Sequence, residues 1–400
     1  MSQNSAMPQK NPRQLVLATL MLCVFGITTG EFVIAGILPD VATDLDVSIP
    51  AAGLLVTAYA IGMIVGGPAL TALTARYPRK PLMLTLLAVT VLGNLASAFA
   101  PSYDLLFVAR IVTALVTSTF FANAIVTAVS TAPPGKQAST VSTLVFGMNV
   151  AMVLGAPIGT FIGNSYGWRS TFLAITVVCA LGLLMTLRLV PAVASAGTSA
   201  VAEFRVFRDR QVLLAIAVTA VGSAGVLMVF IYIAPLLTDL TGFAAGTVAI
   251  MILVFGVGAT VGNFAGGWLS DRAPMRAQLG LLTLLALALL ATWAASASIL
   301  ITAVMVFVLG ALGFSVIPGM QARVMSTATQ APTLAIAVNA SGYQVAAAVA
   351  GWLGGAVIAG PGLPSVYLVA AGITVAGVVV SSLAWRSSRT VVETEQTVAG

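Results

Sequence analysis

The sequence contains no histidine, only two cysteines and few charged residues. Without histidine the chain has no Ser-His-Asp triad, no H-E-x-x-H zinc site and no histidine proton relay. Cys23 and Cys179 are too few for a thiolate metal cluster, and both fall in apolar segments where we expect packing rather than a disulfide. A G-x-x-x-x-G-K-[ST] phosphate loop is also absent. We therefore expect neither an enzyme nor a metal site, and no cofactor.

Charged residues make up 7% of the chain and hydrophobic residues 59%, whereas soluble domains carry about 25% charge. This composition predicts an integral membrane protein. A helix needs about 20 apolar residues to cross a bilayer, and the chain divides into about twelve such segments. We expect helices near residues 15–38, 51–74, 82–100, 102–127, 138–163, 170–190, 211–236, 246–269, 277–297, 299–321, 333–359 and 365–385.

The net charge of +6 follows from where the basic residues lie between these segments. With a cytoplasmic N-terminus, almost all Lys and Arg fall in cytoplasmic loops, Arg169 falls outside, and most loop aspartates are external. This is the positive-inside distribution of a multi-pass protein of the cytoplasmic membrane. It predicts that both termini are cytoplasmic, that the first segment is an uncleaved helix, and that no nucleic acid is bound.

An internal repeat becomes visible when the sequence is shifted by 196 positions. Glycine, proline and arginine positions then coincide in four regions, as in Pro39 with Pro235, Gly66 with Gly262, and Arg76 with Arg272. We predict two six-helix halves, at residues 15–190 and 211–385. The remaining parts are a cytoplasmic N-terminal tail (1–14), a linker (191–210) and a C-terminal tail (386–400).

Each half carries a short basic turn between its second and third helices. Residues 73–80 read Leu-Thr-Ala-Arg-Tyr-Pro-Arg-Lys, and residues 269–276 read Leu-Ser-Asp-Arg-Ala-Pro-Met-Arg. These turns resemble the G-x-L-x-D-R-x-G-R-K loop of the major facilitator superfamily, which implies an all-α fold of twelve transmembrane helices in two pseudo-symmetric halves. The first copy departs from the motif at Ala75 and Pro78, and the alternative role of both turns is to fix topology by charge. The motif residues are Arg76, Arg79, Lys80, Gly267, Asp271, Arg272 and Arg276.

The fifth segment contains Gly155, Pro157 and Gly159, which resemble the G-P-x-x-G-G motif of the antiporter branch of this superfamily. Small residues allow helices to approach closely, and proline bends a helix. We therefore expect a kinked contact between the two halves here. The alternative is an ordinary packing seam of small residues.

Glu31 is an isolated acid inside the first segment, in Thr-Thr-Gly-Glu-Phe-Val-Ile-Ala-Gly-Ile-Leu-Pro-Asp. An ionisable residue within a membrane segment is by default a functional residue. The segment resembles the first helix of the twelve-helix drug:proton antiporters, and Arg110 resembles the arginine of their R-x-x-x-G motif. Glu31 lies 8 residues before Pro39 and Arg110 lies 8 residues after Ser102, so both are about 12 Å deep. We predict that they form the proton-coupling site.

Two alternatives assign these residues no coupling role. Arg110 reaches the outer surface and pairs with Asp104, or Glu31 only bonds neighbouring hydroxyl groups such as that of Thr28. The counterpart of Glu31 in the repeat is Leu227, so the symmetry of the fold does not require the acid. For the substrate cavity, which we expect to be apolar and aromatic, the candidates are Thr113, Thr117, Phe121, Asn123, Tyr232, Asn339, Tyr343 and Gln344.

The resemblance implies proton-driven efflux of small, largely apolar molecules by alternating access. The first helix is most similar to those of bacterial chloramphenicol-type and sugar-type efflux proteins, so an antibiotic such as a phenicol is the expected substrate. The alternatives are efflux of a sugar, nucleoside or other polar metabolite, and an uncoupled facilitator. Expected partners are the substrate, protons and membrane lipids, with the protein acting as a monomer.

Overall fold

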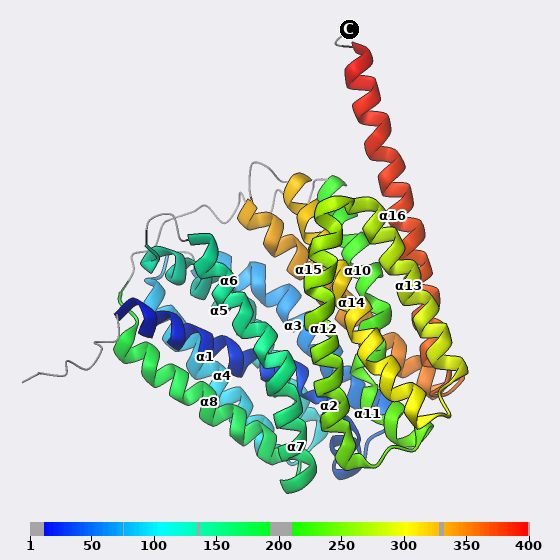
Figure 1. Cartoon of the computed structure of the whole chain (residues 1–400). Helices are drawn as coiled ribbons and strands as arrows, with labels where there is room; N and C mark the ends of the chain where they lie inside the picture. The colour runs from blue at the N-terminus through cyan, green and yellow to red at the C-terminus, as the bar shows by residue number, and fades with distance from the viewer. Residues whose placement is uncertain (1–11, 75, 134–136, 193–209, 328–331, 399–400) are drawn as a thin grey trace, which may run out of the picture.

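The computed structural model describes residues 12–74, 76–133, 137–192, 210–327 and 332–398, and every regular element in these ranges is helical (Figure 1). The first half of the chain forms α1 (Pro12–Phe32), α2 (Ile34–Asp44), α3 (Ile49–Thr74), α4 (Arg79–Ala98), α5 (Tyr103–Thr131), α6 (Gln137–Val150), a π-turn (Ala151–Gly155), α7 (Ala156–Tyr166) and α8 (Trp168–Leu189). The second half forms α10 (Arg210–Ile231), α11 (Ile233–Pro235), a π-turn (Leu236–Thr241), a 3₁₀ turn (Ala245–Thr247), α12 (Val248–Arg272), α13 (Pro274–Ala294), α14 (Ile299–Thr327), α15 (Pro332–Ala359) and α16 (Ser365–Val398).

The number of membrane spans agrees with the sequence prediction. In the described part of the chain, 11 helices are long and apolar enough to cross a membrane. A bent pair, Ile216–Ile231 with Ile233–Thr241, makes the twelfth span, and its two parts meet at 59°. The prediction of an all-helical membrane protein with twelve spans is confirmed.

The first and seventh spans are each broken, which the sequence analysis treated as continuous helices. The first breaks at Val33 and continues to Asp44, and the seventh breaks at Tyr232. Both breaks precede a proline, Pro39 or Pro235, at equivalent positions of the repeat. Proline removes the backbone bond to the residue four positions earlier, which is Ile231 for Pro235, next to the break at Tyr232, whereas Pro39 lies inside α2, six residues after Val33.

The fifth span is also irregular, at the predicted proline. Pro157 has no N–H to offer the carbonyl of Val153, and the five residues Ala151–Gly155 form a π-turn between α6 and α7. The last span differs in length, because α16 continues past residue 385 to Val398. The predicted N-terminal tail and linker fall almost entirely outside the described residues.

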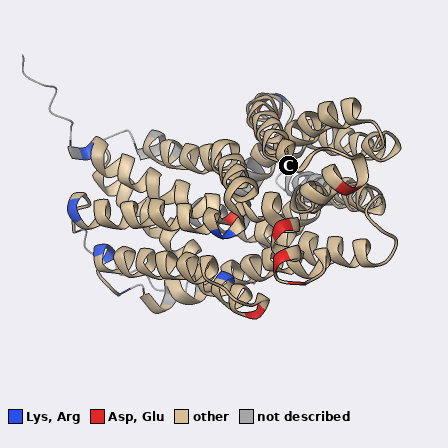
Figure 2. Ribbon diagram, turned by 90° about the horizontal axis from the view of Figure 1, so that it is seen from below, with Lys and Arg blue, Asp and Glu red and all other residues tan. Residues whose placement is uncertain are grey.

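The two ends of the helices differ in the sign of their charged residues. We call the basic end the one carrying the turns that follow α3 and α12 and the C-terminus of α8, and the acidic end the opposite one. Figure 2 shows most of the Lys and Arg positions of the first half at one end of its helices, away from most of the acidic positions. The residues that define the basic end are Arg13, Arg76, Arg79, Lys80, Arg188, Arg272 and Arg276, and those that define the acidic end are Asp40, Asp44, Asp46, Asp104 and Asp239.

One ion pair stabilises the acidic end of the first half. Arg169 at the start of α8 donates to Asp44 at the end of α2 and, through its second nitrogen, to the carbonyl of Ala100 at 3.0 Å. The indole of Trp168 also donates to Asp44, at 3.1 Å. The guanidinium of Arg169 holds the pKa of the Asp44 carboxyl group below its usual range.

The repeat is also visible in how helices touch. Gly66 of α3 lies directly against the backbone carbonyl of Leu115 in α5, and its counterpart Gly262 of α12 lies against that of Ala311 in α14. A side chain at either glycine would collide with this backbone. Equivalent helix pairs are thus joined in the same way in both halves.

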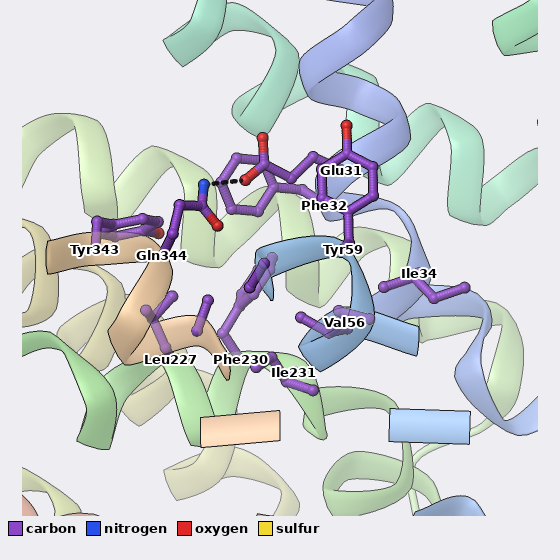
Figure 3. A pocket seen from close by; sticks show the side chains of 13 residues that line it. Glu31, Phe32, Ile34, Val56, Tyr59, Leu227, Phe230, Ile231, Tyr343 and Gln344 are labelled. Carbon is purple, nitrogen blue, oxygen red and sulfur yellow. Dashed lines mark hydrogen bonds between the residues drawn. The ribbon is translucent and has the colours of Figure 1, made fainter. Parts of the chain in front are cut away.

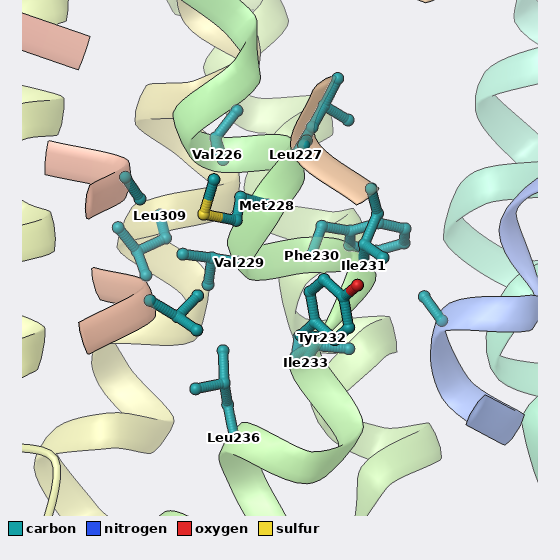
Figure 4. Close-up of a cluster of buried hydrophobic side chains, with 14 of the residues drawn as sticks. Val226, Leu227, Met228, Val229, Phe230, Ile231, Tyr232, Ile233, Leu236 and Leu309 are labelled. Carbon is teal, nitrogen blue, oxygen red and sulfur yellow. The ribbon is translucent and has the colours of Figure 1, made fainter. Parts of the chain in front are cut away.

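Each half contains one large hydrophobic core among the described residues, and that of the second half reaches across the interface. Its centre is the run from Val226 to Leu237 of the seventh span (Figure 4). Residues of the first half also belong to it, including Ala35 and Leu38 of α2 and Met152 of the π-turn. The halves meet near the acidic end, where Asn164 donates to the carbonyl of Ala245 at 3.0 Å. Toward the basic end the two bundles diverge (Figure 1).

Candidate functional site

A small cavity lies between the halves, where the first and seventh spans break. It is enclosed by α1, α2 and α3 of the first half and by α10 and α15 of the second. Its free volume is about 30 Å³, far below the several hundred Å³ of a drug-sized ligand site. The lining residues are Glu31, Phe32, Ile34, Ala35, Val56, Tyr59, Ala60, Leu227, Phe230, Ile231, Tyr343, Gln344 and Ala347 (Figure 3).

Glu31 is the only ionisable acid in this lining. It lies in the last turn of α1, two residues before the interruption at Val33. Its carboxylate accepts a hydrogen bond of 2.9 Å from Nε2 of Gln344 on α15, so the bond joins the two halves (Figure 3). The alternative in which Glu31 bonds only its neighbours is not what the structure shows, because the Thr28 hydroxyl has no hydrogen-bond partner among the described residues.

Arg110 lies deep in the first half, next to the backbone of the turn of α1 that carries Glu31. Its side chain is 1% exposed, its Nη1 donates to the carbonyl of Gly30 at 2.8 Å, and its guanidinium carbon lies 4.2 Å from the ring centre of Tyr59. Within the described residues its Nε and Nη2 have no hydrogen-bond partner. The alternative of an arginine that reaches the surface to pair with Asp104 is therefore wrong.

The carboxylate of Glu31 and the guanidinium of Arg110 interact electrostatically without forming an ion pair. Their charged atoms are more than 4.0 Å apart, with the aromatic ring of Tyr59 over the guanidinium. Their attraction acts on the carboxylate together with its burial and its hydrogen bond from Gln344. In this arrangement Glu31 can be ionised or protonated without the breaking of a direct bond to Arg110.

Tyr59 completes the cluster, and the sequence analysis missed it. It is 2% exposed, lines the cavity and shares a hydrogen bond of 3.0 Å with Thr117 of α5. A signal was present, because the repeat places Phe255 at the equivalent position, so the hydroxyl belongs to the first half alone. The sequence analysis considered the tyrosines of the second half and overlooked this one.

The comparisons with known proteins agree with this architecture. The family model described as Major Facilitator Superfamily matches residues 20–333. The chain belongs to this superfamily. It is 37% identical over 365 residues to the inner membrane transport protein YdhP of Escherichia coli (strain K12), covering 90% of this chain and 93% of the relative. It is 34% identical over 344 residues to a chloramphenicol resistance protein of Streptomyces lividans, covering 84% and 87%.

Solved structures show the same fold. A bacterial homolog to the human lysosomal transporter Spinster, in an inward-facing and occupied conformation, matches with a TM-score of 0.74 at 17% identity, covering 94% of this chain and 98% of that one. At this identity the likeness concerns the fold alone. The protein is accordingly a major facilitator transporter, a multi-pass membrane protein and not an enzyme.

In this transporter, two of the residues predicted for the cavity line it and four do not. Tyr343 and Gln344 line the cavity, as expected. Thr113, Thr117, Phe121 and Asn123 of α5 do not line it. Thr113 and Asn123 donate to carbonyls of their own helix, at 2.8 Å and 2.9 Å, and Phe121 packs in the core of the first half. The described residues do not include the side chain of Asn339.

Tyr232 has a different place from the one predicted. It lies at the break of the seventh span, outside the cavity lining and nearer the acidic end. Its hydroxyl donates to the carbonyl of Gly351 at 2.6 Å, and its ring end lies against Gly53 of α3. Any side chain at Gly53 would collide with it. Tyr232 therefore packs between the halves where they are closed.

The antiporter-like motif contacts both its own half and the other one. Gly155 and Gly159 lie against Thr29 and Val33 of the first span, not against the second half. On the opposite side of the same π-turn, the backbone of Val153 lies against Gly256 of α12. The helix therefore touches the second half as expected, but the motif glycines serve the contact with the first span. Pro157 itself is buried at the start of α7.

The loop motifs lie at the basic end. In the second copy, Arg272 donates to the carbonyl of Trp268 at 3.2 Å, in the last turn of its own helix, and stacks over that indole at 3.7 Å. A base at a helix C-terminus interacts favourably with the carbonyl groups there. Asp271, Arg276 and Arg76 are exposed, whereas Lys80 and Arg79 are partly buried. Gly267 is not crowded, since the nearest neighbour of an added side chain would be Pro318 at 3.9 Å.

Proposed function

We propose that this transporter exports small, largely apolar molecules, an antibiotic such as a phenicol first among them, in exchange for protons. The proposal rests on Glu31, a lone carboxylate in an aromatic and apolar cavity between the halves, beside a buried arginine. A carboxylate placed there gains a proton or loses it as the cavity opens to one side or the other. The likeness to a chloramphenicol resistance protein favours a phenicol substrate.

The distribution of charge and contact suggests the state and the direction. The positive-inside rule favours a cytoplasmic basic end, and the halves are joined near the acidic end and diverge toward the basic end (Figure 1). This is an inward-facing arrangement, in which substrate reaches the cavity from the cytoplasm. A proton arriving from outside then neutralises Glu31 in the outward state, substrate leaves, and the proton is discharged inside on return.

Reconstituted protein tests the coupling. In proteoliposomes with an imposed pH gradient, the wild type should drive chloramphenicol against its concentration gradient, and Glu31→Gln should not, since its amide cannot take up a proton at that site. Asp239→Asn makes the same chemical change at an exposed acid and should transport like the wild type. Gradient-driven export by Glu31→Gln would remove the coupling role, and a wild type that moves no phenicol would remove the substrate assignment.

A further inference from the structure

The bond between Glu31 and Gln344 crosses the interface between the halves at the cavity itself. Glu31 belongs to α1 and Gln344 to α15, whose side chain is 8% exposed. One helical turn nearer the acidic end, Ala348 of α15 accepts a hydrogen bond of 3.1 Å from Thr57 of α3. The Gln344 bond thus lies on the side of this contact from which the bundles diverge, where a change in bonding has most influence on how the halves separate.

The direction of this hydrogen bond depends on whether Glu31 carries a proton. An ionised carboxylate only accepts, so Gln344 must offer its Nε2 group, as the structure shows. Its amide oxygen is then left on the cavity side (Figure 3). A protonated Glu31 becomes a donor, and the acceptor that Gln344 can offer it is the amide oxygen. Protonation therefore favours a half-turn of the amide, which brings the N–H groups to the cavity.

The other charged or titratable groups near Glu31 come from α5, α3 and α8, and Nε and Nη2 of Arg110 have no hydrogen-bond partner among the described residues. From α5, Arg110 donates to Gly30. From α3, Tyr59 shares a hydrogen bond with Thr117, and Cys179 of α8 is a buried free cysteine. From α10 the lining is apolar: Leu227, Phe230 and Ile231.

Tyr343 is the remaining polar group. Its hydroxyl is buried and has no hydrogen-bond partner within the described residues, although it lines the same cavity next to Gln344. A buried hydroxyl left unpaired costs free energy that a ligand can recover. The second half therefore presents two adjacent polar groups, the amide oxygen of Gln344 and the hydroxyl of Tyr343, to whatever occupies the cavity.

We propose that Gln344 relays the protonation state of Glu31 to the second half and to the substrate by turning its amide. This inference rests on the proposed function and deepens it. With Glu31 ionised, Gln344 presents an acceptor to a substrate O–H or N–H. When a proton from the outer side settles on Glu31, the acceptor is withdrawn and the substrate donor loses its partner. The substrate class is thus a small neutral molecule with an aromatic part and a hydroxyl or amide N–H.

The relay can be tested without any substrate. Spin labels at positions 77 and 273, which are equivalent under the repeat and lie at the basic end, report how far the halves are apart. Both native cysteines are buried, so new cysteines at these positions take the labels. In the wild type, the ratio of inward to outward populations should change with pH. Gln344→Met fills a similar volume but offers no amide, and should reduce this change by about tenfold, as expected for a lost bond to an ionised group.

An exchange of the two side chains separates a relay from a structural role. The double variant Glu31→Gln with Gln344→Glu restores an amide beside a carboxyl group, with the proton now taken up on the second half. It should regain a pH-dependent distance change that Glu31→Gln alone has lost. A wild-type pH response in Gln344→Met would overturn the relay, and so would an exchange variant that remains insensitive to pH while it folds and labels normally.

Two phenicols test the hydrogen-bond part. Thiamphenicol and florfenicol differ by one hydroxyl group, which is fluorine in florfenicol. Wild-type protein should prefer thiamphenicol at high pH and lose that preference at low pH, while Gln344→Met should show about the same affinity ratio at both. A preference that persists in Gln344→Met overturns the assignment of the acceptor. If neither compound binds while the spin-label response still depends on Gln344, the phenicol assignment fails and the relay stands.

Discussion

The first half contributes three polar residues to the site, and each has an apolar counterpart in the second half at an offset of 196 positions. The counterparts are Leu227 for Glu31, Phe255 for Tyr59 and Val306 for Arg110. All three counterparts are buried in the core of their own half. The backbone contacts of the two halves are nevertheless equivalent, as the glycines of α3 and α12 show. The fold is therefore repeated, while the ionisable chemistry is confined to one side.

This asymmetry has an energetic reason. An acid or a base within a membrane segment costs several kcal/mol by most estimates, so each is retained only where it acts. Placing Glu31 and Arg110 in one half lets them stabilise each other electrostatically, whereas one charge in each half would be separated when the halves move. The second half contributes neutral polar groups instead, at Tyr343 and Gln344.

The largest effect should come from giving position 110 an apolar side chain, as at the equivalent position of the second half. Arg110→Met removes the bond to Gly30 and the positive charge near Glu31. We expect proton-driven efflux to fall about 100-fold, since a buried bond to a charged group is worth about 1.5–3 kcal/mol. Val306→Met introduces the same side chain at the equivalent apolar position and should leave efflux within about threefold. Similar losses in both variants would show that the asymmetry has no functional meaning.

A smaller effect is expected at the contact of Tyr232 with the first half. Gly53→Leu fills the space that the tyrosine ring end occupies, and overpacking of this kind costs about 1–3 kcal/mol. Spin labels at the acidic end should report halves held further apart, with efflux reduced about tenfold. Gly280→Leu on α13 is the matched control, because no atom lies within 4 Å of an added side chain there. Normal closure in Gly53→Leu would contradict this role for Tyr232.

Tyr59→Phe copies the second half at a single oxygen atom. The variant loses the bond to Thr117, worth about 1 kcal/mol, but keeps the ring beneath the guanidinium. Efflux should fall about fivefold, with a changed pH profile, because the ordering of the site around Glu31 is loosened. Tyr103→Phe loses a hydrogen bond of similar kind, to Ala51 at the acidic end. It should lower thermal stability without altering the pH profile.

The smallest effect should come from Asp44, which belongs to the scaffold of the first half. Asp44→Asn weakens an exposed pair with Arg169, and such pairs contribute about 0–1 kcal/mol. Because the pKa of Asp44 is lowered in the folded state, its contribution is present above the ordinary aspartate pKa and is lost as pH falls through the lowered value. Thermal unfolding in detergent should show a small difference between variant and wild type at neutral pH that disappears in acid. A difference that persists in acid would assign the effect to packing.

The sequence was sufficient to predict the twelve-span fold, and it identified Glu31 and Arg110 as candidate residues of the site. Segment length and charge distribution predict the spans, and rarity identifies Glu31 and Arg110, since few other ionisable residues occur within the apolar segments. Spacing along α5 did not identify the cavity, because a helix in a bundle has neighbours on several sides. Thr113 shares the period of Arg110 yet lies against Gly93 of α4. Which side meets the other half depends on packing that no single helix encodes.

Contacts between halves were the least predictable feature. The partnership of Glu31 with Gln344 joins residues 313 positions apart, and nothing local in either segment specifies it. The breaks at Val33 and Tyr232 were likewise missed, and for the seventh span the reason is that a proline such as Pro235 distorts the preceding turn by an amount that depends on its surroundings.

The contact of Gly66 with the backbone of Leu115, and of Gly262 with that of Ala311, has a mechanical consequence. Each pair of helices is held backbone to backbone, with no flexible side chain between them to absorb a displacement. Helix α5 alone has 29 residues, about 44 Å of length. Each pair therefore moves as a rigid unit, and a small change of tilt at the acidic end produces a larger displacement at the basic end.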